Sequence, residues 1–183
     1  CRLGDVIDSI VGGGTPSKMN ASYWNGNIPW ASGKDLKGKF LHDTIDKITE
    51  IAIESSSTNL IPANNIIVCT RMGLGKICIN KIDTAINQDL KAVFLNKNIE
   101  PEYFYNYYRT LKIIGSGMTV NGIKQEQLLN FHFPLPPLSE QKRIVAEIEK
   151  QLAKTKLVKE HIITNQQATE QLLRALLHQA FEV

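Results

Sequence analysis

The stretch FPLPPLSEQKRIVAEIEK, residues 133–150, divides the chain into two parts of different composition. All 12 glycines and all 7 prolines precede Leu138, and Phe181 is the one aromatic residue after it. The prolines hold the chain extended, Ser139 is a predicted helix N-cap, and Glu140 suits the first helical turn. We therefore predict a globular domain over residues 1–137 and a long helix over residues 138–183.

An apolar seam runs along the predicted helix. Alternate steps of three and four residues give a coiled-coil-like pattern that is apolar at its ends and polar in its middle. Its members are Val145, Ile148, Leu152, Thr155, Lys159, Ile162, Gln166, Thr169, Leu173, Leu176 and Ala180. At about 1.5 Å per residue the helix is roughly 65 Å long, whereas a domain of this size is only about 30 Å across. We therefore expect the helix to pair with another helix rather than remain a solvated helix with charge pairs.

The globular part has the pattern of a mixed α/β domain. Short apolar runs at residues 66–69, 77–79 and 92–95 are bounded by Asn, Gly and Lys, as strands are. A helix is predicted from Pro101 through YFYNYYRTLK, with Glu102 in its first turn and its aromatic side chains in the core rather than stacked on bases. The expected fold class is α+β, with the long helix pairing as an antiparallel coiled coil.

Composition excludes several classes of protein. The 183 residues are 43% hydrophobic and 21% charged, as in an ordinary folded chain, and no run approaches a membrane span or a secretory signal. We therefore expect a cytoplasmic protein. The net charge of +3 permits nucleic acid as a partner without arguing for it. Cys1, Cys69 and Cys78 lack metal-site spacing and are predicted to be buried thiols.

No catalytic motif is complete. GGGTPSK at residues 12–18 and RMGLGK at residues 71–76 are glycine-rich and basic. Both lack the Gly-Lys-Ser/Thr ending of a nucleotide-binding phosphate loop. The four histidines have no metal-binding spacing, and there is no nucleophile elbow. FPLPPL lacks the polar and aromatic residues of an amino-methyltransferase loop. The sequence predicts no active site, no metal and no bound cofactor.

Four segments in order carry a family resemblance. GGGTPS at residues 12–17, YWNGNIPW at 23–30, TRMGLGKICI at 70–79 and GSGMTVNGIKQEQLLNFHFPLPPLSEQKRIVAEIE at 115–149 resemble the specificity subunit of type I restriction-modification systems. The resemblance covers nearly the whole chain. It implies a target recognition domain that reads one half of a bipartite double-stranded DNA sequence, and a spacer helix that docks methyltransferase subunits. S-adenosylmethionine, ATP and Mg would then belong to the modification and restriction subunits, and this chain would catalyse nothing.

The chain departs from that family in carrying a single copy of each part, where members usually carry two. Either a second half has been cut away, or a half-length subunit forms a homodimer through its helix. The polar centre of the seam at Thr155, Lys159 and Gln166 would then meet its own mate in an antiparallel pair.

Affinity for DNA comes from lysine and arginine on phosphates, and sequence preference comes from side chains at base edges. The candidate phosphate contacts are Lys18, Lys34, Lys37, Lys76 and Lys124, for which a plain surface lysine is the alternative. The candidate base contacts are Arg71 for guanine and Asn87 and Gln88 for adenine. The candidate helix-pairing residues are Val145, Ile148, Leu152, Ile162, Leu173 and Leu176.

Other residues of these segments are expected to hold the fold. Gly73, Gly75, Gly117 and Gly122 would supply turns, and Trp24 and Trp30 would pack in the core. Two other functions stay open from the sequence. One is a helix-mediated interaction protein that binds protein or DNA without sequence preference, and the other is an enzyme with an unfamiliar site.

Overall fold

The computed structural model describes residues 1–115 and 122–181. It divides into two compact units, Cys1–Lys142 and Arg143–Val183. Gly117, one of the predicted turn glycines, lies outside the described residues. In the described residues no helix combines the length and apolar character needed to cross a membrane.

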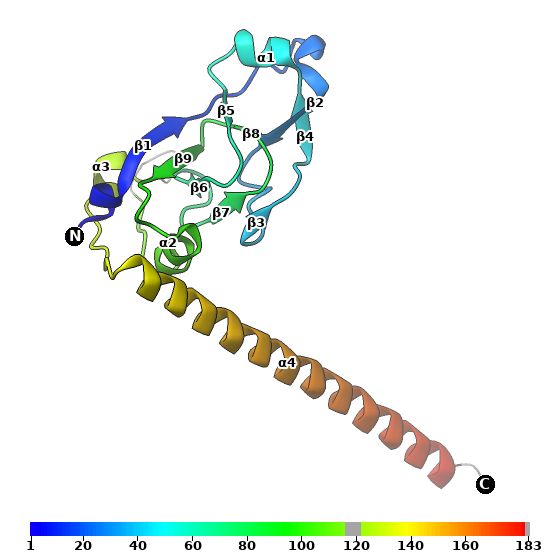
Figure 1. Cartoon of the computed structure of the whole chain (residues 1–183). Coiled ribbons are helices and arrows are strands. Elements are labelled where there is room, and N and C mark those ends of the chain that lie inside the picture. Colours follow the sequence, from blue (N-terminus) through cyan, green and yellow to red (C-terminus); the bar gives the residue numbers. More distant parts are fainter. Residues whose placement is uncertain (116–121, 182–183) are drawn as a thin grey trace. The chain divides into compact units, whose positions relative to one another are not determined.

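Figure 1 labels the larger helices and strands of the chain. Two short 3-10 helices are η1 (Leu3–Val6) and η2 (Ala21–Tyr23). The strands are β1 (Ile7–Gly12), β2 (Trp24–Ala31), β3 (Phe40–Leu41), β4 (Asp46–Ile48), β5 (Asn59–Ile61), β6 (Ile66–Cys69), β7 (Ile77–Asn80), β8 (Thr84–Ile86) and β9 (Leu90–Leu95). The α-helices are α1 (Glu50–Glu54), α2 (Pro101–Tyr108), α3 (Gln125–Leu129) and α4 (Leu138–Phe181).

The strands of the first unit form two mixed sheets. One has the order β1-β9-β6-β7-β3 and the other the order β4-β2-β8-β5. Neighbouring strands are antiparallel except for β3 beside β7 and β2 beside β8, which are parallel. The predicted α+β class is thus confirmed.

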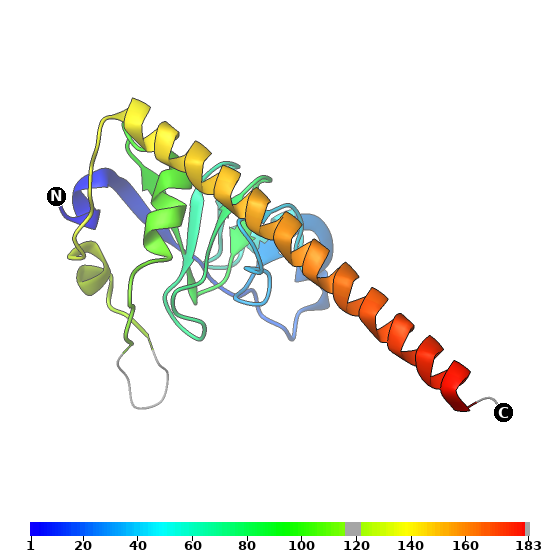
Figure 2. The same ribbon diagram turned by 90° about the horizontal axis from the view of Figure 1, so that it is seen from below.

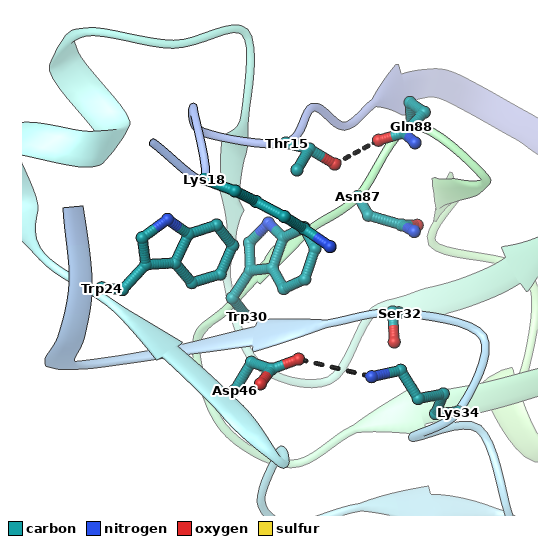
Figure 3. A pocket seen from close by; sticks show the side chains of 9 residues that line it. All are labelled: Thr15, Lys18, Trp24, Trp30, Ser32, Lys34, Asp46, Asn87 and Gln88. Atoms are coloured by element: carbon teal, nitrogen blue, oxygen red, sulfur yellow. Dashed lines mark hydrogen bonds and ion pairs between the residues drawn. The ribbon is translucent and has the colours of Figure 1, made fainter. Parts of the chain in front are cut away.

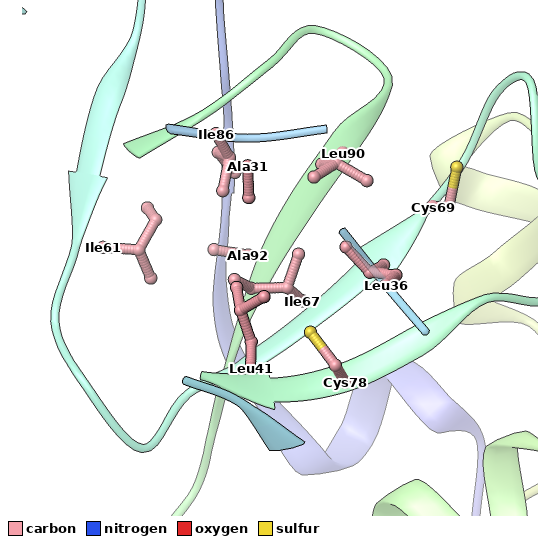
Figure 4. Close-up of a cluster of buried hydrophobic side chains, with 10 residues drawn as sticks. All are labelled: Ala31, Leu36, Leu41, Ile61, Ile67, Cys69, Cys78, Ile86, Leu90 and Ala92. Carbon is pink, nitrogen blue, oxygen red and sulfur yellow. The ribbon is translucent and has the colours of Figure 1, made fainter. Parts of the chain in front are cut away.

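A cluster of buried side chains joins the two sheets. Ile61 and Ile86 come from the four-stranded sheet, and Ile67 and Ala92 come from the five-stranded sheet (Figure 4). These four side chains are at most 1% exposed. The apolar runs that predicted strands therefore supply the five-stranded sheet's side of this contact.

The predicted strands and the first helix agree with the structure in position. β6, β7 and β9 cover the three apolar runs, and α2 begins at Pro101 as predicted. α2 ends at Tyr108, earlier than the predicted helix, and its side chains Tyr103, Phe104 and Tyr108 are buried. Cys69 and Cys78 are buried free thiols. The prediction was wrong for Cys1, which is exposed at the start of the chain.

α4 is one uninterrupted helix of 44 residues (Figure 2). It begins at Leu138, so the prediction that Ser139 is its N-cap was wrong. The carbonyl of Pro137 accepts hydrogen bonds from the backbone N–H groups of Glu140 at 2.9 Å and Gln141 at 3.0 Å. Pro137 thus stands at the capping position, because the carbonyl of the N-cap residue accepts the first hydrogen bond of the helix.

Candidate functional site

The main candidate site is a cavity of about 480 Å³ beside β2. We call it the tryptophan cavity. Its nine lining residues come from the loop after β1, from β2, from the loop after β2, from β4 and from the loop after β8 (Figure 3). They are Thr15, Lys18, Trp24, Trp30, Ser32, Lys34, Asp46, Asn87 and Gln88. Four of the eight candidate DNA contacts therefore line one cavity.

Glycines let the loop after β1 approach the second sheet closely. A Cβ atom on Gly13 would lie 2.1 Å from the carbonyl oxygen of Ile86, and one on Gly14 would lie 2.2 Å from the hydroxyl of Ser57. The N–H of Gly14 donates to the same Ile86 carbonyl at 3.0 Å. The glycine run thus packs against backbone, which places Thr15 and Lys18 at the cavity.

Two tryptophans attach this loop to β2. The indole N–H of Trp30 donates to the carbonyl of Gly14, and that of Trp24 donates to the carbonyl of Ser17, each at 3.1 Å. The rings meet edge to face, with centroids 5.2 Å apart. Trp30 is buried as predicted, whereas Trp24 is half-buried. Both rings form the apolar wall of the tryptophan cavity.

The two amide candidates differ in what holds their side chains. The side-chain oxygen Oδ1 of Asn87 accepts a hydrogen bond from the backbone N–H of Asp89 at 3.1 Å, and the side-chain NH₂ of Asn87 lies 3.4 Å from the Asp89 carboxylate. Asn87 is buried, while Gln88 is exposed and its side-chain oxygen accepts from the hydroxyl of Thr15. Asn87 thus shapes its own loop, and Gln88 is the amide placed to meet a ligand.

The cations at the tryptophan cavity also differ. Lys34 lies 3.6 Å from the carboxylate of Asp46, and both side chains are well exposed. Lys18 makes no ion pair with any described residue and extends over the cavity (Figure 3). A negative ligand would therefore gain most from Lys18, because no carboxylate competes for it.

Arg71 and Lys124 do not line this cavity. The Arg71 Nε lies 3.6 Å from the carboxylate of Asp89, and its backbone forms a β-bridge with Gly122. Lys124 precedes α3. Asp89 therefore ties the loop of Arg71 to the loop of Asn87. This link was not predicted, although an asparagine such as Asn87 commonly closes a turn by bonding the backbone two residues on.

The RMGLGK loop has the backbone that its glycines predicted. Gly73 and Gly75 have φ angles of 151° and 85°, and Met72 also has a positive φ of 50°. The Cys69 thiol donates to the Arg71 carbonyl at 2.7 Å, and burial raises the pKa of that thiol. Cys69 is thus a protonated structural group that supports the loop.

Lys37 and Lys76 lie at a second cavity, of about 360 Å³. Its other lining residues include Tyr105 and Arg109 from the end of α2. Arg109 was not among the predicted contacts, because its distance from Lys37 and Lys76 in the sequence hides their proximity.

Within the described ranges, no group of three or more histidine, cysteine, aspartate or glutamate side chains could hold a metal ion.

The candidate helix-pairing residues lie along α4. Val145 and Ile148 are half-buried, and the other four are exposed. These four are Leu152, Ile162, Leu173 and Leu176, each 52–56% exposed.

Comparison with known proteins gives a consistent family. The sequence model for the type I restriction modification DNA specificity domain matches residues 1–165. A type I restriction enzyme specificity subunit of Escherichia coli is 39% identical over 155 residues, which are 79% of this chain and 38% of that protein. One from Methanocaldococcus jannaschii is 30% identical over 147 residues, 75% of this chain and 34% of that protein.

Solved structures share the fold. The HsdS subunit of Thermoanaerobacter tengcongensis is 26% identical, with a TM-score of 0.62 over 85% of this chain and 38% of that one. A chain from a study of complex assembly and conformational transition in the type I R-M system has a TM-score of 0.75 at 24% identity. That match covers 98% of this chain and 44% of the other. This chain thus spans less than half the length of each of these relatives.

Proposed function

This chain belongs to the family of type I restriction-modification DNA specificity domains, and we propose that it recognises one half of a bipartite DNA sequence. Residues 1–137 would be the target recognition domain, and residues 138–183 would be the spacer helix. The methyltransferase and restriction subunits would supply the chemistry, in a cytoplasmic complex on double-stranded DNA. Their S-adenosylmethionine, ATP and Mg would not bind to this chain.

One observation carries the proposal beyond family membership. The tryptophan cavity gathers the Gln88 amide, two lysines and two indole rings from segments that are far apart in the sequence. Amides can read the edge of adenine, lysines attract phosphates, and an apolar wall excludes water from those contacts. This set supports sequence reading rather than general attraction to DNA.

The sequence read by a reconstituted methyltransferase complex tests the proposal. Mapping of methylated adenines should reveal one bipartite target for the wild-type chain. Gln88→Ala and Arg71→Ala should each relax the preference at one base pair, because a good bidentate contact discriminates by about 1–3 kcal/mol. Lys34→Ala should lower the affinity for all DNA sequences by a similar factor.

Equal binding of arbitrary duplexes by the wild-type complex would contradict the proposal and favour an interaction scaffold. Turnover of DNA by the isolated chain would favour an enzyme. An unchanged target in both Gln88→Ala and Arg71→Ala would remove these two residues from the set of base contacts.

The exposed stripe of α4 supports a second part of the proposal. We assign its partner as another spacer helix of the same kind, from a second copy of the chain or from a second recognition half. Leu152, Ile162, Leu173 and Leu176, the exposed members of this stripe, are each more than half exposed, which is costly in water and is relieved when two such helices pair. In an antiparallel pair of two copies centred near Ile162, Leu152 of one copy would face Leu173 of the other.

Cysteine crosslinking tests the pairing and its direction, in a Cys1→Ser background. A mixture of Leu152→Cys and Leu173→Cys chains should form a mixed disulfide-linked dimer, while Leu152→Cys alone should not. In the antiparallel pair, two copies of residue 152 lie about 30 Å apart, too far for a disulfide. Crosslinking of Leu152→Cys alone would instead establish a parallel pair, and no adduct from any of these chains would contradict helix-mediated homodimerisation.

A further inference from the structure

The second cavity gathers positive charge from three parts of the fold. Lys37 lies on the loop between β2 and β3, Lys76 comes directly before β7, and Arg109 caps the C-terminal end of α2. The remaining lining residues are Leu36, Gly38, Gly75, Ile77 and Tyr105. We call this site the cationic pocket. None of these eight lining residues is acidic.

The side chains of the cationic pocket are held without carboxylates. The Lys76 ammonium donates to the carbonyl of Gly33 at 2.7 Å, and the Arg109 guanidinium lies 5.5 Å from the ring centre of Tyr105. Among the described residues, no carboxylate forms an ion pair with Lys37, Lys76 or Arg109. By contrast, Lys39, two residues from Lys37, pairs with Glu102 of α2.

This arrangement favours an anion. Three like charges around one cavity of about 360 Å³ repel each other, and a bound anion would relieve that repulsion. An arginine and two lysines are the side chains that proteins use on phosphate oxygens, with the planar guanidinium able to make two parallel hydrogen bonds. Phosphate is therefore the chemistry that fits the cationic pocket best.

The position of the pocket points to a phosphate of DNA. The same loop lines both cavities, with Ser32 and Lys34 at the tryptophan cavity and Leu36 and Lys37 at the cationic pocket. A fully extended chain spans at most about 3.6 Å per residue, so the Cα atoms of Lys34 and Lys37 lie within about 11 Å of each other. Each DNA strand carries a phosphate about every 3.4 Å of helix axis. A duplex whose base edges face the tryptophan cavity thus has phosphates within reach of the cationic pocket.

We propose that Lys37, Lys76 and Arg109 form a phosphodiester-binding site that holds the DNA backbone while the tryptophan cavity meets the bases. The inference rests on the proposed function and adds to it a division of labour. The Gln88 amide of the tryptophan cavity would contribute to sequence preference, and the cationic pocket, like Lys34, would contribute to affinity and its dependence on salt.

The test measures DNA affinity against salt concentration for the full chain reconstituted with methyltransferase subunits. The variants are Lys37→Gln and Arg109→Gln, and the matched control is Lys97→Gln, an exposed lysine outside both cavities. Each pocket variant should bind the target duplex and a scrambled duplex with affinities lowered by the same factor, roughly tenfold. Each should also lower the slope of log K against log salt by about 0.9. The control should bind both duplexes like the wild type.

A chemically neutralised backbone identifies the phosphate itself. A set of duplexes carries one methylphosphonate each, at a different position in every duplex. One of them should bind the wild type more weakly than the unmodified duplex does, while its affinity for Arg109→Gln stays unchanged. Thermal unfolding of each variant checks that the fold is retained, and Lys37→Gln, on an exposed loop, keeps the test decisive where Arg109→Gln unfolds.

Three results would overturn the inference. One is a change in the ratio of target to scrambled affinity, which would make the pocket a reading site. Another is an unchanged salt slope in both variants. The third is saturation of the pocket by inorganic phosphate, detected by calorimetry, without any effect on DNA binding. Each is separable from failure of the proposed function, in which the wild-type complex itself would show no sequence preference.

Discussion

The two units of this chain treat similar apolar side chains in opposite ways. In the first unit Ile67 and Ile86 are fully buried between two sheets, whereas Leu173 on α4 is 56% exposed. The first unit therefore contains the surface that covers its own apolar residues. α4 presents an apolar stripe along a helix whose one buried residue, in its described part, is Gln141 in the first turn. The difference teaches that stability is built into the first unit, while the stripe of α4 is left for the helix partner proposed above.

The largest expected effect comes from truncating the same type of contact in each unit. Ile67→Ala should lower the free energy of unfolding by about 2–5 kcal/mol, because it leaves a cavity between the sheets. Leu173→Ala should change the stability of the unpaired chain little, since alanine favours the helix and little burial is lost. Urea unfolding at low protein concentration measures both. Equal losses in the two variants would contradict the comparison.

Gln141 is the buried residue at the start of α4, where the buried first unit gives way to the exposed part of the helix. Its amide donates to the carbonyls of Asn98 at 3.0 Å and Pro136 at 2.9 Å, and its oxygen accepts from the N–H of Glu100 at 2.9 Å. Gln141→Leu should cost about 1–3 kcal/mol, because these backbone groups lose their partner.

The matched control for Gln141 is Gln151→Leu on the exposed part of α4. It should stay within about 0.5 kcal/mol of the wild type, because surface substitutions usually do. Hydrogen exchange of the Glu100 amide should increase in Gln141→Leu alone. Unchanged protection there would show that Gln141 does not anchor the start of α4.

The smallest expected effect is a pH dependence confined to the first unit. Burial, with a further contribution from Asp35, raises the pKa of the Cys78 thiol from 9.0 to about 12. Between these values the folded chain keeps a proton that the unfolded chain releases, so stability present below pH 9 is lost as the pH rises toward 12. The loss from this group is at most about 1.4 kcal/mol per pH unit.

Urea unfolding measures this slope between about pH 8 and about pH 10.5, where ionisation of Cys78 in the unfolded chain begins to lower stability. Cys78→Ala should flatten the decline, whatever its effect on stability at pH 8. Cys1→Ala should leave the slope unchanged, because Cys1 is exposed. An identical slope in Cys78→Ala and the wild type would contradict a role for the buried thiol.

Local sequence patterns predicted those strands and helices whose formation depends on residues close together in the chain. The apolar run at residues 66–69 became β6, because a fully buried strand needs apolar side chains on both faces. Pro101 started α2, because proline suits the first helical turn. The N-cap was predicted two positions too late, because Ser139 is the better capping residue by type while Pro137 is the one that the chain places at the helix entry.

The candidate site was predictable only in part. Lys18, Lys34, Asn87 and Gln88 were singled out by residue type, and the structure gathers them at the tryptophan cavity. Their assignment as DNA contacts stays a prediction. Residue type alone did not reveal that Asp89 holds Asn87.

The sequence by itself determined that the segments of β6, β7 and β9 are strands, where the glycine-free and proline-free helix begins to within two residues, and which family the motifs resemble. These features depend on neighbours within a few positions along the chain. Only the tertiary structure decided the strand order β1-β9-β6-β7-β3 and the meeting of Lys37, Lys76 and Arg109 around one pocket. The physical reason is that sheet pairing and packing join residues dozens of positions apart, and such contacts depend on the fit of whole surfaces rather than on local preference.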